Sequence, residues 1–240
     1  MRVIQDLSAT APDIFGMFFL IAAWVLYAAF AARRGKVVPS LHARMDFYRR
    51  TWMVRMIERE NRMVDVNVMR NVTRSSQFFA STTMLILGAL VALTGYVQQA
   101  LDVLSGLPFT VRGSARLLEI KIGLLVVIFV YAFFKFSWAI RQLNFCGIMM
   151  AAAPGQTKDN PEQHAAVINA IAKITSYAGE HFNNGLRAYY FAVAALAWFL
   201  HPWLMIASTV WVIGVLYRRE FASRTLRAMC EEDTSETLRI

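Results

Sequence analysis

The sequence IFGMFFLIAAWVLYAAFAARRGK, residues 14–36, decides the class of fold. It contains no charged residue from position 14 to 32, and it then carries Arg33, Arg34 and Lys36. As an α-helix, the uncharged part would be roughly 28 Å long, which is close to the hydrocarbon thickness of a bilayer. A cleaved secretory leader carries its positive charge before the apolar run, whereas here the charge follows it. We therefore expect a retained membrane-spanning helix whose N-terminus lies outside the cytoplasm.

Three further apolar stretches occupy residues 78–97, 122–140 and 188–217. The last one is long enough for two crossings if the chain turns at His201 and Pro202, because proline breaks a helix locally. A single kinked helix in this region, giving four spans in total, is the alternative. We predict five spans, at about 14–32, 76–97, 119–140, 181–201 and 203–219.

The distribution of charge predicts the orientation of these spans. Residues 33–75 contain eleven Lys and Arg against four Asp and Glu, so the positive-inside rule assigns this segment to the cytoplasm. Residues 98–115 carry little charge, which suits the outer side. We expect a multi-pass protein of the cell inner membrane, with its N-terminus outside and its C-terminus in the cytoplasm. The net charge of +9 follows from this topology and requires no nucleic acid as a partner.

The segments that are expected in the cytoplasm have a helical pattern. Apolar residues recur at helical spacing over about 41–75 and 161–180, with charged residues between them. These amphipathic helices are expected to continue into the second and fourth spans. No repeat and no low-complexity linker divides the chain. The predicted fold is therefore an all-α transmembrane helical bundle, a single domain over residues 1–240 with long cytoplasmic extensions.

The most polar stretch beside a predicted span is GEHFNNGLRAYY, residues 179–190. On a helix, Glu180, Asn183, Arg187 and Tyr190 share one face, and Asn184 lies beside them. Such a stripe near the inner leaflet is costly unless it faces protein or water. One interpretation is the polar lining of a pore or of a small-anion site, anchored by Arg187. The other is a helix end whose arginine reaches the interface while the amides are hydrated.

Two other sets of cations are candidates for a site. Lys121 and Lys135 nearly share a face of the third span and could line the same path, although lysines near span ends also serve as interfacial anchors. Anchoring is the expected role of Lys135. Arg70, Arg74 and Arg141 lie at the cytoplasmic ends of two spans. They could form a basic vestibule or contact anionic lipid head groups, each contact contributing about 1 kcal/mol.

Signatures of other functions are absent from the sequence. It contains no phosphate-binding glycine loop, nucleophile elbow or zinc-protease helix, so we expect no enzyme. The four histidines cannot be paired at facing depths, so we expect neither haem nor another cofactor. No His, Cys, Asp or Glu cluster has metal-ligand spacing. Cys146 and Cys230 both fall on the predicted cytoplasmic side, where inert, unpaired thiols are expected.

Three segments carry a resemblance to a known family. They are ENR at 60–62, FFKFSWAIRQ at 133–142 and HFNNGLRAYYF at 181–191. With them, nearly the whole chain resembles the bacterial and plant group called domain of unknown function 599. The resemblance implies an integral membrane protein, and it carries over no catalytic residue.

Together these features predict a homo-oligomeric channel or transport protein whose fourth span lines a polar path. The alternative is a non-catalytic membrane scaffold or accessory subunit that binds a partner or anionic lipid through its cytoplasmic helices. The expected partners are membrane lipids, with anionic head groups, and further copies of the chain.

Overall fold

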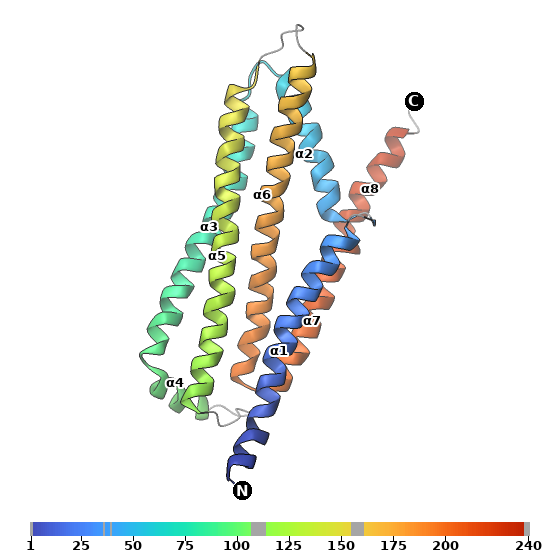
Figure 1. Ribbon diagram of the computed structural model, residues 1–240. Helices are drawn as coiled ribbons and strands as arrows, with labels where there is room; N and C mark the ends of the chain where they lie inside the picture. The colour runs from blue at the N-terminus through green and yellow to red at the C-terminus, as the bar shows by residue number, and fades with distance from the viewer. Residues whose placement is uncertain (1, 36, 39, 107–113, 155–160, 238–240) are drawn as a thin grey trace. The chain divides into compact units, whose positions relative to one another are not determined.

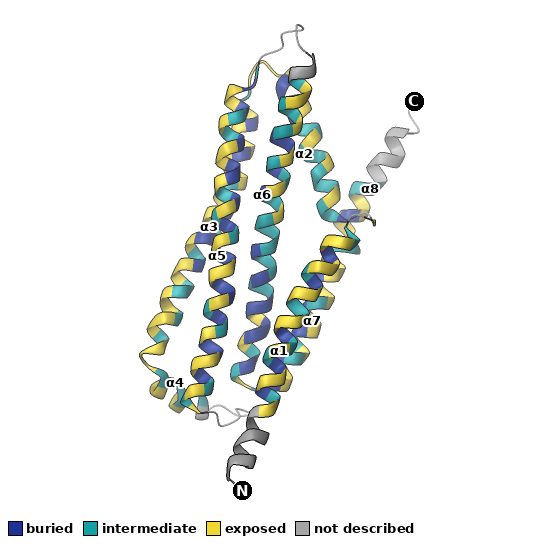
Figure 2. Cartoon of the chain, viewed as in Figure 1, coloured by how far each residue is buried: buried dark blue, intermediate teal, exposed yellow. Residues whose placement is uncertain are grey.

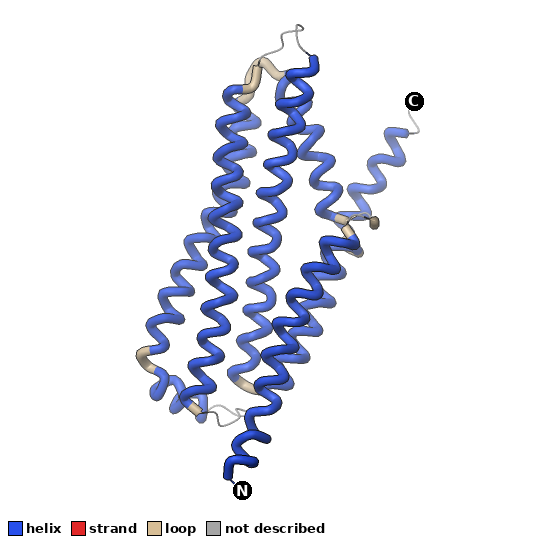
Figure 3. Tube along the Cα trace, viewed as in Figure 1, coloured by secondary structure: helices blue, strands red, loops and turns tan. Residues whose placement is uncertain are grey.

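The computed structural model describes residues 2–35, 37–38, 40–106, 114–154 and 161–237. In these ranges the regular structure is helical and no strand occurs, which confirms the expected all-α class (Figure 3). Residues 107–113 of the expected outer loop lie outside the described residues. The helices are α1 (Arg2–Arg34), α2 (Leu41–Glu58), α3 (Met63–Thr94), α4 (Val97–Ser105), α5 (Ala115–Ala152), α6 (Pro161–Leu196), the short 3-10 helix η1 (Ala197–Phe199), α7 (Pro202–Phe221) and α8 (Arg224–Thr237).

Three of the described helices are long and apolar enough to cross a membrane. They are Ala11–Arg34 within α1, and the whole of α3 and α5. Much of their apolar surface points outward (Figure 2): Phe18 is 62% exposed, Leu85 75% and Val127 63%. In water such surfaces would be covered by other protein, whereas acyl chains solvate them directly. Length, composition and exposure therefore all fit a multi-pass membrane protein.

The helices pack into two compact units. Unit 1 contains residues 1–33, 82–132 and 186–217, and unit 2 contains residues 34–81, 133–185 and 218–240. Helices α3, α5 and α6 each contribute residues to both units.

Within unit 1, the helices alternate in direction. Asp13 and Trp24 of α1 contact Lys121 and Tyr131 of α5 in the same order along both helices, so these two helices run parallel. Helix α7 runs the same way, while α3 and α6 run in the opposite direction (Figure 1). Buried alanines on α6, which include Ala188 and Ala195, allow the neighbouring helices to approach closely.

The turn between α6 and α7 was expected at His201 and Pro202, and it lies there. The α-helical part of α6 ends at Leu196, η1 follows, and α7 begins at Pro202. Proline suits the first helical position because its missing N–H would have no partner there. The backbone N–H of Trp203 donates to His201 Nδ1 over 3.2 Å, so the histidine side chain caps the new helix. The region forms two helices with a turn between them rather than one kinked helix.

Unit 2 is held together by a sulfur-rich apolar core. Its buried members come from α2, α3, α5 and α6: Met53, Met56, Ile57, Met69, Leu143, Cys146, Met150, Ile171, Ala172 and Ala178. Arg62, just before α3, lies at one end of this core and binds the C-terminal end of α5. Its guanidinium donates to the carbonyl oxygens of Met150, Ala153 and Pro154 over 3.1, 2.9 and 2.7 Å. These carbonyls lie at the C-terminus of α5, where the helix itself supplies no donors.

The prediction of one continuous helix over 41–75 is wrong at residues 59–62, which separate α2 from α3. Asn61 Oδ1 accepts the backbone N–H of Met63 over 2.9 Å and so caps the start of α3. Asp65, fully buried, accepts from Trp52 Nε1 and from Arg59 Nη1, each over 2.6 Å. The amphipathic pattern continues through the break because α2 and α3 bury residues in the same core.

Candidate functional site along helix α6

The middle of α6 is polar and half-buried. Six side chains between residues 181 and 190 carry polar groups, and each is neither fully buried nor fully exposed: His181, Asn183, Asn184, Arg187, Tyr189 and Tyr190. Glu180, one residue earlier, is exposed. Of the predicted stripe, Glu180, Asn183 and Asn184 belong to unit 2, while Arg187 and Tyr190 belong to unit 1.

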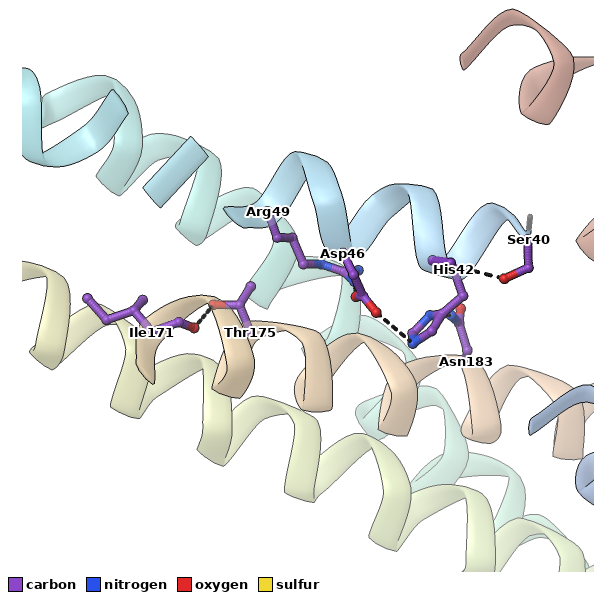
Figure 4. A network of polar contacts seen from close by, with 8 residues as sticks. Ser40, His42, Asp46, Arg49, Ile171, Thr175 and Asn183 are labelled. Atoms are coloured by element: carbon purple, nitrogen blue, oxygen red, sulfur yellow. Dashed lines mark hydrogen bonds and ion pairs between the residues drawn. The ribbon is translucent and has the colours of Figure 1, made fainter. Parts of the chain in front are cut away.

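In unit 2, the polar face of α6 meets polar side chains of α2 (Figure 4). Asn183 Nδ2 lies 3.3 Å from His42 Nδ1. The other ring nitrogen of His42 lies 3.7 Å from Asp46 Oδ2, and Arg49 donates to Asp46 Oδ1 over 2.7 Å. The helix-start residue Ser40 accepts the N–H of Ala43 and so fixes the first turn of α2. A chain of polar groups therefore lies between α2 and α6.

Two glycines, Gly179 and Gly185, allow α6 to pack closely against side chains of α2 and α5. A Cβ atom at Gly179 would collide with the guanidinium of Arg49. At Gly185 it would lie 2.6 Å from the ring of Phe136. Phe136 in turn contacts Phe79 and Phe182, with ring centres 5.4 and 5.6 Å away. The glycines of the polar stretch thus have a packing role in unit 2.

In unit 1, the polar residues of α6 meet aromatic neighbours. The Arg187 guanidinium carbon lies 5.9 Å from the centre of the Tyr27 ring, a cation–π distance. Tyr189 and Thr83 share a hydrogen bond of 2.8 Å between their hydroxyl groups, and the Tyr189 ring packs edge-on against Phe129. Arg187 thus lies against an aromatic face in a half-buried position.

Lys121 is buried inside unit 1, where its charge has partners within the protein. It is 8% exposed, and its Nζ donates to the Trp198 carbonyl oxygen over 2.8 Å. The same Nζ lies 3.6 Å from Asp13 Oδ1, which also accepts from Trp198 Nε1 over 2.7 Å. Sequence reasoning missed Asp13 and Trp198 as partners. A signal existed: Asp13 is the acidic residue directly before an uncharged span, and Lys121 is a cation near the matching end of another span.

The remaining candidate cations belong to unit 2. Lys135 is half-buried, while Arg70, Arg74 and Arg141 are exposed. The guanidinium carbon of Arg141 lies 5.6 Å from the centre of the Phe145 ring. These three arginines therefore share one unit, and Arg187 belongs to the other.

The part of the chain that the structure describes contains no group of three or more His, Cys, Asp or Glu able to hold a metal ion. The Cys146 thiol is buried and accepts a hydrogen bond from Thr175 Oγ1 over 3.2 Å. Thr175 also bonds back to the Ile171 carbonyl oxygen (Figure 4). Packing accounts for the burial of this cysteine.

Comparison with known proteins agrees with the resemblance noted from the sequence. A family model described as "Protein of unknown function, DUF599" matches residues 15–225, which include α2, α3, α5, α7 and the polar stretch of α6. No curated protein and no solved structure matches the chain. Since the family model covers most of its length, the protein belongs to the DUF599 family.

Proposed function

We propose that the protein is a homo-oligomeric channel or transport protein of the inner membrane, and that the polar stretch of α6 lines the path of a small anion. The observation that carries this proposal is the uniform half-burial of the six polar side chains between residues 181 and 190. The proposal involves no catalytic step, no cofactor and no nucleic acid.

Half-burial of polar groups is informative in a membrane protein. Polar side chains that face acyl chains are costly, and those that are sealed in a helix core need a full set of partners. We infer that the open part of these half-buried side chains is hydrated in the membrane, since water satisfies polar groups that acyl chains cannot. Arg187 supplies a positive charge in this stretch, and the adjacent Tyr27 ring holds its guanidinium in place. An anion is therefore the expected solute.

The direction of the helices in unit 1 supports five spans, which put the two termini on opposite sides of the membrane; the positive charge of residues 33–75 is what favours a cytoplasmic C-terminus and an outer N-terminus. A chain with this topology requires its first, third and fifth spans to run one way and its second and fourth the other. Helices α1, α5 and α7 share one direction, and α3 and α6 share the opposite one (Figure 1). We infer that α6 and α7 cross the bilayer in addition to α1, α3 and α5.

A second candidate function, a membrane scaffold or accessory subunit, is favoured by one specific observation. Apolar side chains of unit 2 are exposed on segments that we expect beyond the bilayer, including Val64 at 62%, Val68 at 40% and Ile148 at 68%. Val64 and Val68 are one turn apart and share a side of α3, and contiguous apolar patches commonly mark a protein-binding surface. Crosslinking in native membranes tests this candidate: recovery of self-contacts alone would argue against a separate partner.

Flux through purified protein in liposomes tests the transport proposal. We expect chloride efflux at both signs of voltage, and a change of about tenfold in the chloride-to-potassium ratio for Arg187→Ala. Arg187→Lys should keep most of the preference because it keeps the charge. Arg55→Ala, an exposed arginine of α2, is the matched control and should behave as the parent protein. Liposomes that stay impermeable to both ions would overturn the proposal.

A further inference from the structure

The contacts made by α3, and by Arg62 just before it, with α5 in unit 2 show which residues of these two antiparallel helices lie at the same height along their axes. At one end, Arg62 binds the carbonyls of Met150, Ala153 and Pro154. At the other, Phe79 stacks on Phe136 with ring centres 5.4 Å apart. Between them, Met69 shares a core with Cys146. Because both helices rise about 1.5 Å per residue, interpolation places Arg74 at the level of Arg141.

Three exposed arginines therefore lie within about one turn of the same level of this helix pair. Arg70 and Arg74 are one turn apart on α3 and share a side of the helix. Arg141 lies at the matching level of α5, with its guanidinium over the Phe145 ring. The buried residues of the same turns, Met69 and Leu143, face the core. The arginines thus lie on the outer surface of the pair.

Exposed aromatic side chains lie next to these arginines, toward the predicted spans. The same alignment places Phe78 of α3 and Trp138 of α5 at about the same level, roughly one turn from Arg74 and Arg141. Phe78 is 65% exposed and Trp138 47%. Aromatic residues at the ends of spans mark the level of the lipid head groups. The predicted spans, 76–97 and 119–140, end between these aromatic residues and the arginines.

We propose that Arg70, Arg74 and Arg141 form a binding site for the phosphate of an anionic phospholipid in the cytoplasmic leaflet, with acyl chains against Phe78 and Trp138. Guanidinium groups bind phosphate oxygens by paired hydrogen bonds, and the apolar surface beside them gives the rest of the lipid a place to lie. A second copy that docked through this same face would bring its own three arginines toward these, so a symmetric dimer contact fits the surface less well than a phosphate does. The site depends on membrane embedding and not on solute transport.

Lipid binding to purified protein tests this site. The probes are a phosphatidylglycerol, a phosphatidylcholine with the same acyl chains, and inorganic phosphate. Native mass spectrometry counts bound lipids, and the lipid-induced rise in melting temperature measures the effect on stability. The test variant is Arg70→Gln/Arg74→Gln/Arg141→Gln. The charge-matched control is Arg50→Gln/Arg55→Gln/Arg227→Gln, which changes exposed arginines elsewhere in unit 2.

We expect phosphatidylglycerol to bind the parent and the control variant, and the test variant to bind it on the order of a hundredfold more weakly. Binding of phosphatidylcholine should be the same in all three proteins, which shows that the variants remain folded. Equal losses in test and control variants would show general electrostatic attraction and overturn the site. An equal response to inorganic phosphate alone would show a free-anion site and overturn its assignment to lipid. Neither outcome depends on the flux measurement.

Discussion

Lys121 of α5 and Asp13 of α1 form an ion pair of 3.6 Å in which both side chains are buried. Trp198 completes the pair: its carbonyl oxygen accepts from the lysine and its indole donates to the aspartate. Three helices of unit 1 are joined at this point. Each charge is stabilised by the other, because neither has access to bulk water.

Removing one partner of this pair should destabilise the protein. Asp13→Ala leaves the Lys121 charge buried and the Trp198 indole without its acceptor, at a cost of about 3–5 kcal/mol. Thermal unfolding in detergent should show a lower melting temperature for Asp13→Ala and for Lys121→Met. The double variant should lose less than the sum of the two single losses. Additive losses would show that the two charges are not coupled, and Arg33→Ala provides an exposed control on α1.

The close approach of α6 to α5 predicts the effect of adding one methyl group. Gly185→Ala would push against the Phe136 ring and should destabilise the protein by about 1–3 kcal/mol. At Gly147, in the same unit, an added Cβ would meet no atom within 4 Å. Gly147→Ala should therefore be neutral or stabilising, since alanine favours a helix by up to about 1 kcal/mol. Equal melting temperatures for the two variants would contradict this packing.

Arg62 should be needed to keep the last turn of α5 helical, because it supplies the hydrogen-bond donors for that turn's carbonyl oxygens. Its fork-shaped guanidinium reaches three carbonyl oxygens, whereas a lysine ammonium cannot match that geometry. Hydrogen exchange should be faster at residues 148–154 in Arg62→Ala, and Arg62→Lys should restore only part of the protection. Exchange in α7 should not change. Full protection in Arg62→Lys would show that charge alone is sufficient.

The sequence predicted those helices and turns that are determined by residues close together in the chain. An uncharged run of bilayer length identified α1, and proline predicted the turn at His201 and Pro202. The break at residues 59–62 was missed: the cap of Asn61 on Met63 is a local signal that was overlooked, and the contact of Trp52 with the buried Asp65 is tertiary. The pairing of Asp13 with Lys121 joins residues far apart in the chain, and helical periodicity carries no information on such contacts.

Among the candidate residues, the sequence could assign residue type and helix face but not neighbours. Asn183 was recognised as polar and near a span, yet its partner His42 comes from a segment that was assigned only a general amphipathic role. Lys121 was proposed to line a path because it nearly shares a face of the third span with Lys135. Its burial in an ion pair with Asp13 depends on how α1, α5 and η1 pack together, which the sequence pattern does not reveal.

The position of the C-terminus separates five spans from four. A reporter that is active only in the cytoplasm, fused after Ile240, should be active, because the turn before α7 returns the chain to the inner side. A reporter fused within the loop after α4 should be inactive and serves as the control. Activity of the second fusion but not of the first would reverse the proposed topology.

Thiol accessibility along α6 tests the central claim most directly. In a background without Cys146 and Cys230, single cysteines at Asn183, Arg187 and Val193 would be treated with a charged, membrane-impermeant thiol reagent. The account predicts that Asn183→Cys and Arg187→Cys react, because they lie on a hydrated path. Val193→Cys should not, because Val193 is 63% exposed and apolar and would face acyl chains. Reaction at Val193→Cys with none at Asn183→Cys and Arg187→Cys would contradict a solvated path along this helix.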